Sequence, residues 1–124
     1  MAFIDANYIL RYLLQDNPKQ FLIVKEVIEN QEISLTDFIF AEVVYVLEKV
    51  YSVPKSDIKE SLGGLIKYKY LFMENKNVIL KSLQIYSENK IDFADALLIA
   101  YHQESSNTIL HTFDKKILKI ISLE

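Results

Sequence analysis

The sequence of 124 residues contains no cysteine, which excludes disulfide bonds and thiolate metal sites. Any bound metal ion must therefore have oxygen or imidazole ligands, and such ligands favour hard cations such as Mg²⁺ or Mn²⁺. Glycine and proline are also scarce, with two of each, and 51% of the residues are hydrophobic. This composition argues against disorder. We expect a single domain that spans residues 1–124.

Long apolar runs are absent too. No stretch approaches the roughly 18 uninterrupted apolar residues of a membrane span, and Asp5 interrupts the start of the chain before the apolar part of a signal peptide could form. We therefore expect a cytoplasmic protein with no membrane partner. The formal net charge of −3 taken alone speaks against a nucleic-acid partner. If several acids surround divalent cations, however, the remaining surface is neutral to basic.

Common catalytic signatures are missing as well. The sequence has no glycine-rich phosphate loop, no G-x-S-x-G elbow and no Walker motif. Its two histidines, His102 and His111, would permit a metal-free ribonuclease that uses paired imidazoles. They fall within a predicted helix and a predicted strand, where histidines are more often structural.

Short apolar segments alternate with longer amphipathic ones. The strand candidates are residues 2–4, 33–35, 70–73 and 108–113, of which the last has the clearest pattern. Helices are predicted from Pro18, from Asp37 to about Tyr51, around 58–66 with a weak point at Gly63-Gly64, over 78–86, and from Phe93. This alternation predicts an α/β fold with a parallel sheet and helices on both faces.

Four acids follow the predicted strands. Asp5 and Asp114 stand directly after strands, Glu42 is on the helix that leaves the second strand, and Asp95 is in the first turn of another helix. Ligands of open parallel sheets bind at the carboxyl ends of the strands, so we expect these acids to share one pocket. Because like charges raise one another's pKa, such a cluster requires a compensating cation.

Glu42 is the only charged residue in the segment FIFAEVVYVL at 38–47. No positive side chain lies at helical spacing from it within this segment. We interpret Glu42 as a carboxylate that is tolerated in an apolar helix because it faces a metal site. The alternative is a position on an exposed stripe of the helix.

The other acids also have structural alternatives. Asp92 and Asp95 match the N-cap and third position of a helix, where acids are stabilised by the helix dipole, and for Asp92 we favour that role. Asp5 and Asp114, each taken alone, match ordinary turn residues at strand ends. The joint placement of the acids is what favours a site.

Four segments in order resemble the PIN domain family, specifically the small VapC-type toxins of toxin–antitoxin pairs. They are FIDANYILRYLL at 3–14, SLTDFIFAEVVYVLEK at 34–49, IDFADALLIAY at 91–101 and ILHTFDKKILKI at 109–120. The resemblance implies a three-layer α/β/α fold with a central parallel sheet of about four to five short strands flanked by helices. One departure is Ser105-Ser106-Asn107, where the family often has glycine; asparagine tolerates left-handed geometry.

The resemblance further implies a metal-dependent endoribonuclease, in which Mg²⁺ or Mn²⁺ activates a water that cleaves RNA in line. The implied metal-binding and catalytic acids are Asp5, Glu42, Asp95 and Asp114. The residues expected to support them through hydrogen bonds are Asn7, Thr36, Asp92 and Thr112. The family also implies a homodimer and a cognate antitoxin whose C-terminal segment covers the acidic pocket.

Two other functions remain open at this stage. One is a phospho-receiver-like signalling domain, which has a similar length and acids at strand ends. Against it, the sequence lacks paired acids after the first strand and a clear acceptor aspartate after a middle strand. The other is a catalytically inactive PIN-like module that only binds a partner protein.

Overall fold

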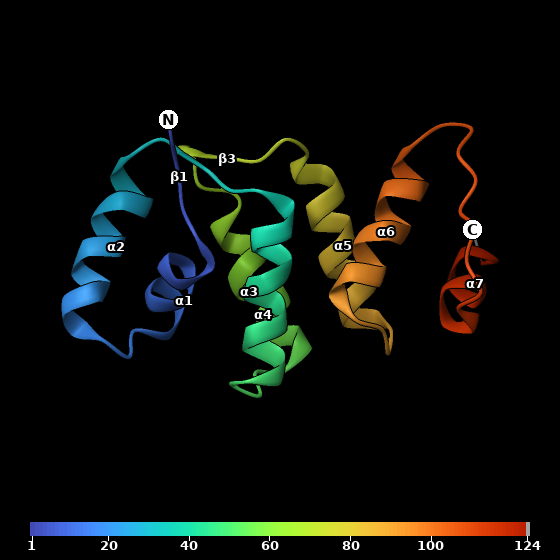
Figure 1. Ribbon diagram of the computed structural model, residues 1–124, viewed down its shortest axis with the longest axis horizontal. Helices are drawn as coiled ribbons and strands as arrows, with labels where there is room; N and C mark the ends of the chain where they lie inside the picture. The colour runs from blue at the N-terminus through green and yellow to red at the C-terminus, as the bar shows by residue number, and fades with distance from the viewer. Residues whose placement is uncertain (124) are drawn as a thin grey trace. The chain divides into compact units, whose positions relative to one another are not determined.

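A parallel sheet organises the N-terminal part of the chain in the computed structural model, which describes residues 1–123 (Figure 1). The strands are β1 (Ala2–Phe3), β2 (Ile33–Ser34) and β3 (Leu71–Phe72), in the order β1-β2-β3. In the central strand, Ile33 is fully buried and pairs with Ala2 on one side and Leu71 on the other. The predicted α/β class with a parallel sheet is confirmed.

Seven helices complete the described part of the chain. They are α1 (Ala6–Leu14), α2 (Pro18–Asn30), α3 (Asp37–Lys49), α4 (Lys55–Leu65), α5 (Lys76–Glu88), α6 (Phe93–Glu104) and α7 (Lys115–Ile121). Over residues 1–123, none of these helices has both the length and the apolar character that crossing a membrane requires.

The chain forms two compact units, one of residues 1–76 and one from residue 77 onward, and each is described by itself. In the first unit, α1 packs against α2 and α3, and α3 packs against α4. Apolar residues at helical spacing form the packed faces, as the sequence pattern requires. They include Ile9, Leu10, Val24, Ile28, Phe40, Val43, Val44, Leu47, Ile58 and Leu62, all buried. The expectation of one domain over residues 1–124 stays a prediction.

Two helix starts in the first unit follow directly from the sequence. The Asn17 side chain accepts a hydrogen bond from the backbone N–H of Gln20 at 3.1 Å, and Pro18 occupies the first position of α2. The Thr36 hydroxyl accepts from the N–H of Ile39 at 3.4 Å. Both side chains satisfy a backbone donor that the helix itself leaves unpaired. The helix starts predicted at Pro18 and Asp37 are thus confirmed.

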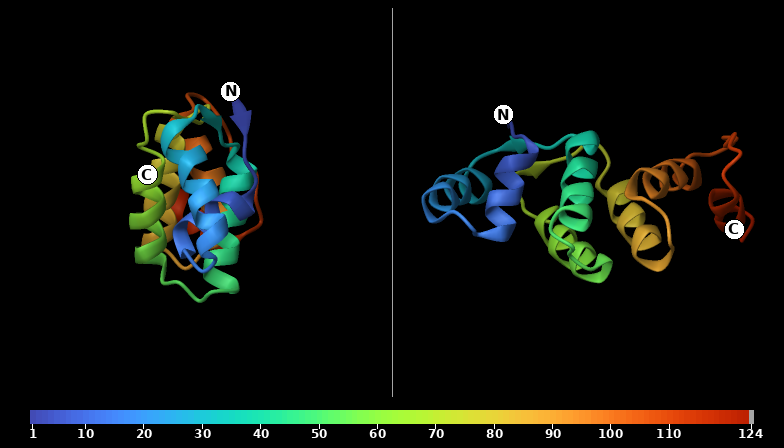
Figure 2. Two further views of the ribbon diagram at one scale, coloured as in Figure 1. Left: turned by 90° about the vertical axis from the view of Figure 1, so that its left-hand side faces the viewer. Right: turned by 60° about the horizontal axis from the view of Figure 1, so that its bottom comes forward.

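The second unit contains α5, α6 and α7. Figures 1 and 2 show α5 and α6 side by side. A Lys81–Glu104 ion pair at 3.3 Å and an edge-to-face contact of Tyr86 with Phe93 join the two helices. Helix α7 packs against α6 and buries Ile117. The aromatic contact and the buried isoleucine fix how these three helices meet.

The strand predicted at 108–113 is wrong, since this stretch has no strand pairing in the described structure. Its hydroxyl groups are instead bonded locally. The Thr108 hydroxyl donates to the carbonyls of His102 and Ser105, and the Thr112 hydroxyl accepts from the N–H of Asp114 at 3.0 Å. A run rich in β-branched and aromatic residues favours extended backbone but supplies no partner for a ladder. The sheet of residues 1–123 thus has three strands, below the four to five expected.

The two glycines do not interrupt α4, and the weak point expected at them stays a prediction. Gly63 and Gly64 lie inside the helix, and neither has a positive φ. The backbone conformation at these positions is therefore open to any L-residue. By contrast, Asn107 has a φ of 60°, the left-handed geometry that was expected where the family often has glycine.

Gly63→Ala should raise the free energy of unfolding by about 0.5–1 kcal/mol, because alanine restricts the unfolded chain and favours the helix. A Cβ atom at this position would meet no heavy atom within 4 Å, so no clash offsets the gain. Urea denaturation measures the change. Gly63→Pro serves as the control, and its free energy of unfolding should fall by roughly 3 kcal/mol. A destabilised alanine variant would contradict the helical assignment of this turn.

Candidate functional site

Several predicted site residues begin helices. The Asp5 carboxylate accepts a hydrogen bond from the N–H of Tyr8 at 3.1 Å at the start of α1. One oxygen of Asp114 accepts from the N–H groups of Lys116 and Ile117, at 2.8 and 3.0 Å, at the start of α7. The N-cap positions of α3 and α6 are occupied by Thr36 and Asp92. Helix N-termini carry partial positive charge, which stabilises carboxylates there.

Capping leaves part of each carboxylate available. The cap bonds of Asp5 and Asp114 each use a single oxygen, Oδ1. The second oxygen of each side chain is free to accept a bond from a ligand or to bind a cation, since both side chains are exposed. The cap therefore fixes the position of the side chain and leaves one carboxylate oxygen available to a ligand or a cation.

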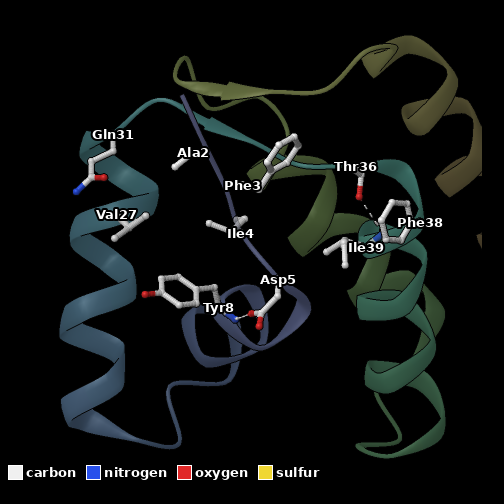
Figure 3. A pocket seen from close by; sticks show the side chains of 10 residues that line it. All are labelled: Ala2, Phe3, Ile4, Asp5, Tyr8, Val27, Gln31, Thr36, Phe38 and Ile39. Atoms are coloured by element: carbon white, nitrogen blue, oxygen red, sulfur yellow. Dashed lines mark hydrogen bonds between the residues drawn. The ribbon is translucent and has the colours of Figure 1, made fainter.

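In the first unit, Asp5 borders an open groove of about 840 Å³ (Figure 3). Figure 3 shows that β1, α1, α2 and α3 all contribute to its walls, and that the caps of Asp5 and Thr36 are formed at its edge. The residues that line it are Ala2, Phe3, Ile4, Asp5, Tyr8, Val27, Gln31, Thr36, Phe38 and Ile39. Phe3 is 77% exposed and Phe38 is 68% exposed. The groove thus combines apolar walls with one carboxylate.

Asn7 lines a second, smaller pocket of about 250 Å³ together with Asp5. Arg11 also lines this pocket and is held by Asp16, at 2.8 Å, and by the Tyr51 hydroxyl, at 3.3 Å. Sequence reasoning missed Arg11. The available signal was a lone cation in the otherwise uncharged segment ANYILRYLL of α1.

Glu42 lies on the exposed side of α3, and its predicted place at a metal site stays a prediction. Its side chain is exposed, and it is not among the residues that line either described pocket. The buried face of α3 consists of Phe40, Val43, Val44 and Leu47. Apolar residues also occupy the exposed side of the helix, where Tyr45 is 62% exposed. Because both sides of α3 are apolar, the neighbouring residues could not reveal that the carboxylate faces solvent.

In the second unit, three predicted acids lie close enough to influence one another. The pKa of Asp95 is raised, first by burial and then by the charges of Asp114 and Asp92. The ammonium group of Lys116 opposes this effect and lowers the pKa. Contact between α6 and α7 brings these residues together across about 20 positions of sequence. Asp95 and Asp114, two members of the predicted cluster, thus influence each other's charge, and their shared site stays a prediction.

Thr112 supports Asp114 through the main chain. Its hydroxyl accepts a hydrogen bond from the N–H of Asp114 at 3.0 Å. That bond fixes the backbone from which the carboxylate projects, whereas the sequence suggested a bond to a carboxylate. Thr36 likewise acts on the backbone, at Ile39.

The donor chemistry of the second unit suits a hard cation. Neither unit, within residues 1–123, gathers three or more acidic or histidine side chains into a group that could hold a metal ion. Mg²⁺, however, is usually held by one or two carboxylates, with water and phosphate oxygens in the other positions. Asp95 and Asp114 are carboxylates of that kind, and a cation shared by the two stays a prediction. Asp5 and Glu42 belong to the first unit, and the shared pocket of all four acids stays a prediction.

Asp95→Asn should stabilise the protein at pH 7 by up to about 1 kcal/mol, since it removes a carboxylate whose charged form is disfavoured in the folded state. Because the pKa is raised in the folded state, the ionised carboxylate destabilises the fold fully at neutral pH. This destabilisation declines as the pH falls through the raised pKa. The advantage of the variant should be lost near pH 4, the ordinary value for aspartate. Urea denaturation between pH 4 and 8 measures it.

Asp57→Asn is the matched control, because Asp57 is also a first-turn acid, in α4. This variant should show no comparable gain in the free energy of unfolding at pH 7. A gain from Asp95→Asn that persisted unchanged at pH 4 would contradict a charge effect and assign the change to packing.

Comparison with known proteins adds one decisive result to this geometry. No curated protein and no solved structure matches the chain. A family model does match, under the description PIN domain, over residues 2–122. This range includes all four predicted acids and most of both compact units. The chain therefore belongs to the PIN domain family.

Proposed function

We propose that the protein is a cytoplasmic, Mg²⁺- or Mn²⁺-dependent endoribonuclease and the toxin of a toxin–antitoxin pair. The observation that carries this proposal is the family match over residues 2–122. PIN domains are typically nucleases, which supports a hydrolase of nucleic acids. The proposed metal-binding and catalytic acids are Asp5, Glu42, Asp95 and Asp114.

The charge balance of the second unit supports a divalent cation. Asp92, Asp95 and Asp114 together raise the local negative potential, and burial adds to the cost of the Asp95 charge. Perturbed acids of this kind are common at functional sites. Asp95 and Asp114 would hold the cation through their free oxygens, and the cation would supply charge neutralisation and Lewis acidity at the scissile phosphate.

The groove beside Asp5 supports a peptide partner. Phe3, Phe38 and Ile39 give it apolar walls, and Asp5 offers a carboxylate at its edge. A segment with an apolar side chain and a basic side chain would satisfy both features. We propose that the C-terminal segment of a cognate antitoxin binds there. The homodimer remains part of this proposal on the family resemblance alone.

Cleavage of total RNA by the purified protein, free of antitoxin, tests the activity. We expect discrete cleavage with Mg²⁺ or Mn²⁺ and none with EDTA. Asp5→Asn should abolish it, since asparagine keeps the cap of α1 but lacks the charge. Asp57→Asn is the control and should cleave normally.

The other outcomes separate the alternatives. Cleavage that survives both EDTA and Asp5→Asn would contradict the proposal and point to contamination or to the histidines. If no cleavage occurs, binding of beryllofluoride with Mg²⁺ would support a phospho-receiver. The absence of both activities would support a protein-binding module.

Glu42→Gln should lower the cleavage rate by more than about 100-fold, because changes to the groups that merely support a metal ligand already cost 10- to 100-fold. Its free energy of unfolding without metal should stay within about 0.5 kcal/mol of the wild type, as expected for an exposed side chain. Glu60→Gln, at an exposed position of α4, is the control. A large loss of stability in Glu42→Gln would make Glu42 a structural residue instead.

A further inference from the structure

An acidic ribonuclease site requires cations nearby, because its carboxylates repel the phosphates of the substrate. The chain carries a net charge of −3, so such cations must be concentrated at particular places. In the second unit, Lys81 is already paired with Glu104. Three further lysines are found within the seven residues of α7.

These three lysines occupy one side of α7. At about 100° per residue, Lys115, Lys116 and Lys119 fall within one arc of roughly 100°, and the buried Ile117 lies on the far side. All three lysine side chains are exposed, and none forms an ion pair with a residue of the described chain. We call these residues the lysine face. Its ammonium groups are available to a ligand.

The lysine face lies directly beside the acids. Its helix begins at Asp114, which accepts the backbone N–H of Lys116 at 2.8 Å. The ammonium group of Lys116 also acts on the carboxyl group of Asp95. A phosphate bound by this face would therefore lie near a phosphate bound at Asp114 and Asp95.

An aromatic side chain accompanies the lysines. Phe113, the residue before Asp114, is fully exposed. Single-stranded nucleic acids are commonly bound by basic side chains that contact the backbone and exposed aromatic rings on which bases stack. Both elements are present within the seven residues from Phe113 to Lys119.

We propose that the lysine face of α7 binds the backbone phosphates of single-stranded RNA next to the acidic residues, with Phe113 as a stacking surface for a base. The proposal rests on the ribonuclease function and deepens it by naming where the substrate is held. It identifies contacts to the backbone, so it predicts little preference for sequence.

The test measures binding of a fluorescein-labelled uridine dodecamer by fluorescence anisotropy at several salt concentrations. EDTA is present, so that metal-dependent cleavage does not consume the probe. The variant Lys115→Gln/Lys116→Gln/Lys119→Gln should bind more weakly, and the slope of log K against log salt should fall by about 2, since each lost phosphate contact in a single strand contributes about 0.7. An adenosine dodecamer should show the same change.

The control variant replaces three exposed lysines of the first unit, Lys25, Lys59 and Lys67, by glutamine and has the same net charge. Its slope should match that of the wild type. A variant in which the three lysines of α7 are replaced by arginine should also show the wild-type slope of log K against log salt. Phe113→Ala should lower the affinity about tenfold without changing the slope, because stacking involves no counterion release.

The outcomes distinguish the two proposals. If the α7 glutamine variant binds RNA with the wild-type slope, the proposal that the lysine face binds RNA phosphates is wrong. The proposed ribonuclease function would not be affected by that result. An equal loss of slope in the control variant would also overturn the proposal for the lysine face, because the effect would then reflect net charge alone. If the wild type neither binds nor cleaves RNA, both proposals fail.

Discussion

Side-chain caps at helix N-termini are the interaction on which the candidate site depends. Asp5, Thr36 and Asp114 each accept a backbone N–H that no helical carbonyl could reach. Each cap contributes about 1 kcal/mol to its helix. In the two aspartates, the same bond also fixes one carboxylate oxygen and leaves the other free. Structural and chemical roles are thus combined in one side chain.

This combination makes the structural and functional interpretations of the acids compatible. A cap aspartate looks ordinary in sequence, and in isolation Asp5 and Asp114 match simple turn residues. The PIN domain match covers the range that contains all four predicted acids, and their functional roles stay a prediction. A capped carboxylate is also well suited to bind a cation, since its position is already fixed before the cation arrives.

The second unit shows how opposite charges can be arranged at one helix start. Asp114 and Asp95 supply negative charge, and the lysines that follow Asp114 supply positive charge within the next turns of α7. Carboxylates that attract a cation and ammonium groups that attract a phosphate must lie close together if both are to act on one substrate. In the proposed arrangement, Asp114 stands directly before α7 and the three lysines follow within it, while Ile117 anchors the opposite side of the helix.

The sequence by itself determined the alternation of short strands and helices, the helix starts at Pro18 and Asp37, and a strand within 70–73, since apolar periodicity and capping chemistry act over a few residues. It also identified the acids. Local pattern could not decide whether residues 108–113 pair with a sheet, because a ladder needs a partner from elsewhere in the chain. Nor could it decide which side of α3 is buried, because Phe38 and Tyr45 make the exposed side apolar too. Only the tertiary structure places Glu42 in solvent and brings Asp92, Asp95 and Asp114 together, since packing between helices decides both.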